Sequence, residues 1–172
     1  MPPGIHLAEK TMAENMIKTN DDLRGRKILI VDDNEQNAEL LQAYLEPLEC
    51  AVEIAGDGIE ALEKIEANRP DIILLDIMMP RMSGFEVCKR VKKNPQTCDI
   101  PVVMVTALNE MGDIERGIDS GADDFLSKPI NKLELLTRVK SLLRVCHLKS
   151  ELERTLSYLA EVEKEENPSS NS

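Results

Sequence analysis

The sequence predicts an α/β fold in which a parallel sheet is covered by helices on both faces. Short apolar runs alternate with amphipathic segments from residue 27 onward, and this alternation is typical of parallel sheets with helical crossovers. The run "IILL" at residues 72–75 is continuously apolar, as a fully buried strand requires. Because aromatic residues make up only 2% of the chain, we expect an aliphatic core.

The expected strands and helices follow one another in regular order. Strands are expected at 27–31, 51–55, 71–76, 101–107 and 124–127. Helices are expected at 34–46, 57–68, 84–93 and 111–121, and a further helix starts near Ile130. Apolar residues recur at helical spacing, as Ile59 and Leu62 do in the second helix. Pro47 ends the first helix and Gly121 the fourth.

Polar residues stand where the expected strands end. Asp32 and Asp33 end the first strand, Asp76 the third and Thr106 the fourth, and Lys128 follows the fifth. Ligands of such open sheets bind outside the carboxyl ends of the strands. Crowded carboxylates repel one another, and hard oxygen ligands suit Mg²⁺, whereas a lysine and a hydroxyl suit a phosphoryl group. Each residue alone has an ordinary interpretation as a cap, strand residue or surface charge, but their joint position favours a site.

Four motifs carry a family resemblance: "ILIVDDNEQN", "DIILLDIMMPRMSGFEV", "IPVVMVTAL" and "GADDFLSKPI". With them, residues 27 to about 145 closely resemble the receiver domain of two-component response regulators. The resemblance implies a flavodoxin-like (βα)5 doubly wound sheet with strand order 2-1-3-4-5, to which this chain adds a C-terminal helical extension.

The resemblance also implies a phosphoacceptor and a metal site. Asp76 matches the phosphoacceptor position. Asp33 resembles the direct Mg²⁺ ligand and Asp32 assists it, while Asp76 and the main-chain carbonyl of Met78 complete the protein ligands.

Further roles follow at matching positions. Thr106, Lys128 and Ala107 would bind the phosphoryl group. Thr106 and Phe125 would form the conformational switch, and the Lys128–Pro129 peptide bond is commonly cis in this family.

The function implied is that of a signalling switch rather than a turnover enzyme. A sensor histidine kinase or phosphotransfer protein would phosphorylate Asp76, and the face built from the fourth helix, fifth strand and fifth helix would respond. One alternative is a receiver-like interaction module that is never phosphorylated. Another is a regulatory piece of a cyclic-di-GMP enzyme, because "KPINKLELLTRVKSLLR" resembles receivers that precede such domains.

Two apolar side chains predict a long-lived phosphorylated state. Met78 and Leu108 lie two residues beyond the acceptor aspartate and the switch threonine. In the resembled family, polar residues at these positions help to place the attacking water. The alternative is that both side chains merely cover the pocket.

The expected organisation has four parts. These are a flexible segment at 1–25, the receiver domain at 26–145, a helical extension at 146–166 and a disordered tail at 167–172. In the extension, apolar residues and one threonine follow a heptad-like spacing: Leu148, Leu152, Thr155, Leu159 and Val162. The spacing predicts a homodimer formed through this helix; an exposed linker helix and a helix that folds back are the alternatives.

Charge and composition exclude several classes. The net charge of −11 disfavours binding to nucleic acid or anionic membranes. No apolar run approaches the length of a membrane span and no signal peptide is recognisable, so we expect a cytoplasmic protein. The cysteines have no zinc-site or paired spacing and are expected to be reduced; they are Cys50, Cys88, Cys98 and Cys146.

Two motifs resemble other sites only weakly. "GDGIEA" at residues 56–61 fits a dinucleotide-binding turn, but it follows the second strand and is better explained as a tight turn into a helix. A haloacid-dehalogenase-like phosphatase would need a second aspartate two residues after Asp76, where this chain has Met78.

Overall fold

The computed structural model describes residues 23–107 and 111–166 of the 172-residue chain. Five parallel strands form one sheet in the order β2-β1-β3-β4-β5. Their bounds are β1 Lys27–Val31, β2 Ala51–Ala55, β3 Ile72–Asp76, β4 Val102–Thr106 and β5 Asp124–Ser127. The flavodoxin-like strand order expected from the sequence is therefore confirmed.

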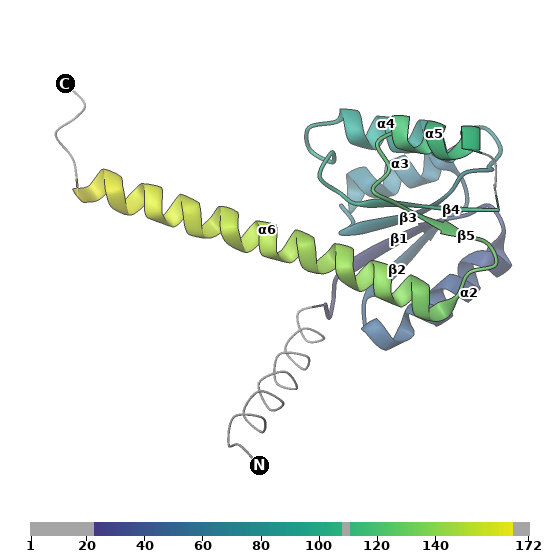
Figure 1. Cartoon of the computed structure of the whole chain (residues 1–172), viewed down its shortest axis with the longest axis horizontal. Coiled ribbons are helices and arrows are strands. Elements are labelled where there is room, and N and C mark those ends of the chain that lie inside the picture. The colour runs from purple at the N-terminus through teal and green to yellow at the C-terminus, as the bar shows by residue number, and fades with distance from the viewer. Residues whose placement is uncertain (1–22, 108–110, 167–172) are drawn as a thin grey trace, which may run out of the picture.

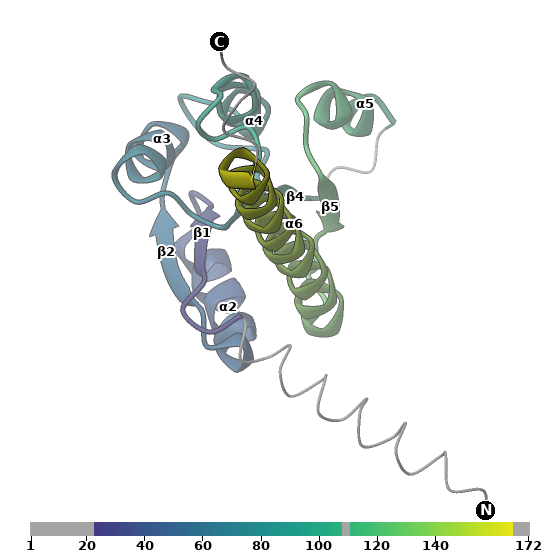
Figure 2. The same ribbon diagram turned by 90° about the vertical axis from the view of Figure 1, so that its left-hand side faces the viewer.

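Helices cover both faces of the sheet (Figure 1). Their bounds are α2 Glu35–Leu45, α3 Gly58–Ala67, α4 Gly84–Lys93, α5 Met111–Asp119 and α6 Lys132–Glu166, and the 3₁₀ turn η1 Glu46–Leu48 follows α2. Figure 2 shows α2 and α6 on one side of the sheet and α3, α4 and α5 on the other.

The strand sequences explain this layered arrangement. Successive side chains of a strand point to opposite faces, so the two apolar cores draw on alternate residues. Leu29 and Val31 of β1 belong to the core beneath α3 and α4, whereas Ile28 and Ile30 belong to the core beneath α2 and α6. The central strand β3 is buried along its whole length, including Asp76 at its end. The apolar runs are thus continuous because both faces of the sheet are covered.

The packed body begins slightly earlier than the sequence suggests. Leu23 is only 1% exposed and belongs to the core beneath α2 and α6. The backbone N–H of Gly25 donates to the carbonyl of Glu49, and the Cys50 thiol donates to the carbonyl of Leu23. Residues 23–25, which the sequence assigns to a flexible lead-in, therefore pack against the body. Residues 1–22 and 167–172, with the flexible segment and tail expected there, lie outside the described residues.

The last helix runs far beyond the sheet, as the sequence predicts. Leu143 is its last buried side chain, and α6 continues as a helix to Glu166. In Figure 1 this part projects away from the body. No helix in the described part of the chain is long and apolar enough to cross a membrane.

Candidate functional site

Three carboxylates meet at the carboxyl edge of the sheet. One oxygen from each of Asp32, Asp33 and Asp76 lies within 4.8 Å of the others. Asp32 and Asp76 are buried, with exposed fractions of 3% and 7%, whereas Asp33 is exposed. Among the described residues, this group has the donors for a hard divalent cation, and its chemistry fits Mg²⁺.

Local backbone contacts explain the placement of Asp32. The backbone N–H of Asn34 donates to Asp32 Oδ1 at 2.9 Å. The side chain of Asn34, in turn, caps α2 by accepting a hydrogen bond from the Asn37 N–H at 3.2 Å. Because Asn34 is the cap of α2, Asp32 and Asp33 are not needed for that role.

Lys128 supplies the positive charge of the site. Its Nζ lies 3.5 Å from Asp32 Oδ2 and 3.5 Å from Asp76 Oδ2. The backbone N–H of Lys128 donates to the carbonyl of Thr106 at 2.8 Å, so the ends of β4 and β5 are held side by side. The Lys128–Pro129 peptide bond is cis, as the family resemblance implies.

The position of Asp76 depends on Gly84, which the sequence analysis did not identify. A Cβ at residue 84 would overlap the backbone carbonyl of Asp76 and would lie 2.9 Å from Ile77 Cα. The Gly84 N–H also donates to the Ile77 carbonyl at 2.9 Å. The first residue of α4 is thus pressed against the end of β3, and only glycine fits there.

The environment of Asp76 raises the pKa of its carboxyl group. Desolvation by burial is the largest cause, and the negative charge of Asp32 adds to it. The ammonium group of Lys128 and a hydrogen bond from the Met78 N–H act in the opposite direction. The net direction is upward, so the ionised form of Asp76 lowers the stability of the folded protein when no divalent cation is bound.

This cost predicts a stabilising substitution. We expect Asp76→Asn to raise the free energy of unfolding at pH 7, without divalent cations, by on the order of 1 kcal/mol. Because the folded-state pKa of Asp76 is raised, ionisation lowers stability as pH rises through that pKa, and the penalty disappears below the ordinary pKa of aspartate. The advantage of the variant should therefore shrink as pH falls from 7 towards 4. Urea unfolding followed by circular dichroism measures both effects.

A control and a contradicting result are available for this prediction. Asp119→Asn alters an exposed aspartate at the end of α5 and should change stability little. An Asp76→Asn variant that is less stable than the wild type at pH 7 would show that the ionised carboxylate is not a source of instability.

The remaining residues expected at the site lie around these groups. Met78 follows Asp76 with its side chain 68% exposed, and Ala107 is exposed just after β4. Thr106 is buried at the end of β4. Leu108, the second residue of the lifetime prediction, lies outside the described residues.

Phe125 lies on the neighbouring edge strand and faces α5. It is partly buried and packs against the core beneath α3 and α4. A Cβ at Gly117 would lie 2.7 Å from the Cζ of Phe125, so the aromatic ring rests directly against the backbone of α5. The sequence analysis identified Phe125 but not the glycine that makes room for its ring.

The dinucleotide-like motif at 56–61 is a capped turn. The side chain of Asp57 caps α3 by accepting from the N–H groups of Ile59 and Glu60, and Asp57 also pairs with Arg81. A carboxylate therefore occupies the helix N-terminus, which supports the tight-turn interpretation.

The sequence of the chain is similar to those of known proteins from one family. The family model for the response regulator receiver domain matches residues 28–140. The response regulator PleD of Caulobacter vibrioides is 51% identical over 118 residues, which are 69% of this chain and 26% of PleD. The transcriptional regulator RpaA of a Synechocystis strain is 44% identical over 118 residues, which cover 69% of this chain and 49% of RpaA. The chain thus spans about a quarter to a half of the length of these relatives.

Solved structures agree with the sequence relatives. A response regulator from Chloroflexus aurantiacus has a TM-score of 0.68 at 37% identity, and the match covers 70% of this chain and 99% of that one. The chemotaxis protein CheY4 of Vibrio cholerae has a TM-score of 0.65 at 34% identity, with coverage of 68% and 98%. With the strand-end carboxylates and the confirmed strand order, these matches show that the chain belongs to the receiver-domain family of two-component response regulators.

Proposed function

We propose that the chain is a cytoplasmic signalling switch in which Asp76 accepts a phosphoryl group from a phosphohistidine. The donor would be a sensor histidine kinase or a phosphotransfer protein, the partners with which receiver domains interact. One observation carries the proposal. The Asp76 carboxylate ends the central strand, shares a cluster with Asp32 and Asp33, and lies 3.5 Å from the Lys128 ammonium group.

The proposed reaction uses the groups of this edge directly. An oxygen of Asp76 attacks phosphorus in line, the bond from phosphorus to the histidine nitrogen breaks, and an acyl phosphate forms. Lys128 neutralises charge on the phosphoryl oxygens, while the Thr106 hydroxyl and the Ala107 backbone N–H donate hydrogen bonds to them. Mg²⁺, held by Asp32, Asp33, Asp76 and the carbonyl of Met78, would supply further positive charge for these oxygens.

Beryllofluoride provides a direct test, because it mimics a phosphoryl group on a carboxylate. We expect the wild-type chain with Mg²⁺ to give a protein-bound ¹⁹F NMR signal, and Asp76→Ala to give none. A wild-type chain without a bound signal would favour the unphosphorylated interaction module.

A groove beside the site supports a helical phosphodonor partner. A cavity of about 210 Å³ lies between α2 and the loop after β5, and Asp32 and Lys128 are among the residues that line it. Most of the other lining side chains are apolar, among them Leu40, which is 46% exposed, and Pro129, and Asn37 and Tyr44 also line the cavity. We propose that a helix carrying the phosphohistidine packs on α2 here and presents its imidazole to Asp76.

The proposed switch couples this edge to the face of α5, β5 and α6. Phosphorylation would draw the Thr106 side chain towards the new phosphoryl group, and the space vacated would admit the ring of Phe125. Support comes from the adjacent positions of Thr106 and Phe125 on β4 and β5, where Met104 is paired with Phe125 and Thr106 with Ser127.

The ring of Phe125 gives a readable signal of this switch. The chain has only two phenylalanines, so labelling with fluorophenylalanine gives two ¹⁹F resonances. We expect beryllofluoride with Mg²⁺ to shift the Phe125 resonance more than that of Phe85. Gly117→Ala should shift the same resonance without any ligand, because the added methyl group displaces the ring. An unchanged Phe125 resonance in the beryllofluoride state would contradict the proposed switch.

The exposed side chain of Met78 is proposed to prolong the phosphorylated state. We expect Met78→Asn to accelerate loss of the phosphoryl group about tenfold, because a polar side chain at this exposed position places the attacking water. The half-life of phosphorylated chain after removal of acetyl phosphate measures this. The control is Ile59→Asn, which changes an exposed apolar residue on α3 and should leave the half-life unchanged. Equal half-lives for Met78→Asn and the wild type would reject a role for Met78.

We also propose that the projecting part of α6 joins two copies of the chain. Most of its apolar residues are exposed in the single chain, and the exposed fractions of Leu148, Leu152 and Leu159 are 62%, 59% and 50%. An isolated helix of this length is only marginally stable in water, so we expect these apolar residues to pack against a second helix. Sedimentation of a Leu152→Glu, Leu159→Glu variant should give the monomer mass at concentrations where the wild type is dimeric. Equal masses would reject the helix as the dimer contact.

A further inference from the structure

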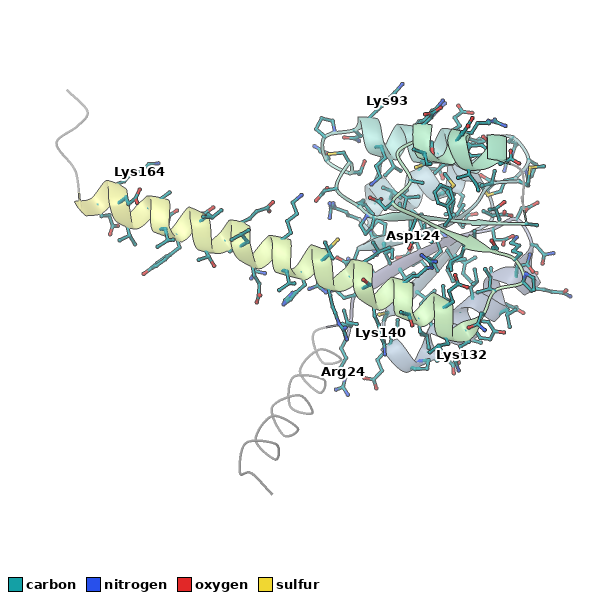
Figure 3. All side chains as sticks on the ribbon, viewed as in Figure 1. Arg24, Lys93, Asp124, Lys132, Lys140 and Lys164 are labelled. Carbon is teal, nitrogen blue, oxygen red and sulfur yellow. The ribbon has the colours of Figure 1, made fainter. Side chains whose placement is uncertain are left out.

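The charges along α6 are distributed unevenly. Between residues 138 and 149 the helix has four basic residues and no acidic one. Between residues 151 and 166 it has six acidic residues and two basic ones. Figure 3 shows Lys140 beside the body and Lys164 towards the far end of the projecting helix. We call residues 138–149 the basic base of α6, of which Arg144 and Lys149 lie beyond the last buried residue Leu143, and we call residues 151–166 its acidic tip.

The heptad spacing that starts at Leu148 can be extended by one apolar residue towards the N-terminus of α6, and we call the extended set the apolar stripe. Val145 is 60% exposed and lies three residues before Leu148, at the distance that continues the heptad. The stripe then contains Val145, Leu148, Leu152, Thr155, Leu159 and Val162. Its residues alternate between steps of three and four along the entire projecting segment.

This stripe can pair with itself in the antiparallel sense without an unmatched residue. When Leu152 faces Thr155 of the second copy, Leu148 faces Leu159 and Val145 faces Val162, and the two-fold axis repeats these layers. Each threonine then packs against a leucine. Its hydroxyl is satisfied within its own helix, where it donates to the carbonyl of Glu151 at 2.9 Å.

The charges beside the stripe distinguish the two possible directions. In a parallel pair, Arg144 flanks the stripe next to Lys149 of the second copy, and the acidic tips lie together. In the antiparallel pair, Arg144 faces Glu165 of the second copy, and residues 141–149 of each helix lie along residues 158–166 of the other. Parallel pairing thus brings like charges together where antiparallel pairing brings opposite charges together.

We infer that two copies of this chain associate through antiparallel α6 helices, the basic base of each against the acidic tip of the other. The inference rests on the proposed dimer function of α6 and adds its direction. The two receiver bodies then lie at opposite ends of the helix pair. Because the contact is short, association should be weak and concentration-dependent.

Charge reversal gives opposite results for the two directions. In sedimentation equilibrium of the full chain at low salt, Arg144→Glu should raise the dimer dissociation constant about tenfold, and Glu165→Arg should do the same. The double variant restores the opposite charges and should return the constant to near the wild-type value. Both residues are exposed, and helix content by circular dichroism verifies that each variant is folded.

A parallel arrangement of the two helices predicts different results. A parallel pair would be strengthened by Arg144→Glu, because the new carboxylate would face Lys149. It would also tighten as salt is added, whereas the antiparallel pair should weaken. A lower dimer dissociation constant for Arg144→Glu, or unchanged dissociation constants for both single variants, would overturn the antiparallel direction but not the dimer itself. A wild-type chain that is monomeric at all concentrations would overturn the dimer as well, while the beryllofluoride experiment still decides the phosphorylation function.

Discussion

Gly84→Ala is expected to lower the free energy of unfolding by about 3 kcal/mol and to disable the acceptor site. The added Cβ would overlap the Asp76 carbonyl and lie 2.9 Å from Ile77 Cα. Both neighbours are backbone atoms, so no side-chain rotation can relieve the overlap. The start of α4 must then move away from β3, and the hydrogen bond from Gly84 to the Ile77 carbonyl is strained or lost.

Chemical unfolding and beryllofluoride binding together measure this effect. The matched control is Gly112→Ala in α5, where an added Cβ would meet no heavy atom within 4 Å. This control should be neutral or slightly stabilising, because alanine favours a helix more than glycine does. A Gly84→Ala variant as stable as the control, with normal beryllofluoride binding, would show that the contact between α4 and β3 does not position Asp76.

Lys128→Gln is expected to slow phosphorylation of the chain by about 10²- to 10³-fold. The Lys128 ammonium group lies 3.5 Å from both Asp32 and Asp76, and among the described residues it is the cation that pairs with the proposed acceptor. Its removal leaves the carboxylates without this partner and takes away the charge that would stabilise the phosphoryl oxygens. It should also raise the pKa of Asp76 further, since Lys128 opposes the upward effect of burial.

The initial rate of mass increase with acetyl phosphate and Mg²⁺ measures this prediction. Lys132→Gln, an exposed lysine at the start of α6, is the control and should keep the wild-type rate. A Lys128→Gln rate within about threefold of the wild type would mean that Lys128 only neutralises the resting site.

The sequence predicts the fold and the strand-end residues well for a simple physical reason. Each apolar run ends where the sheet ends, so the first polar residue after it lies at the carboxyl edge, as Asp32 and Thr106 do. The order of strands then brings the ends of β1, β3, β4 and β5 together. The positions of these polar residues along the chain are therefore sufficient to predict this part of the site.

Contacts between elements are harder to predict. The approach of Gly84 to Asp76 depends on the path of the intervening loop, in which Arg81 adopts a positive φ of 67°. The contact of Phe125 with Gly117 depends on how closely α5 packs on β5. Neither distance is contained in a hydrophobic pattern, although a glycine at the first position of a helix is a signal of close approach.

The central claim is that Asp76 carries the phosphoryl group. Chain treated with acetyl phosphate and Mg²⁺ can be reduced with borohydride, which converts an aspartyl phosphate to homoserine, and then digested and sequenced by mass spectrometry. Our account predicts homoserine at residue 76 and at no other aspartate. Homoserine at a different aspartate, or a fully unmodified chain, would contradict it.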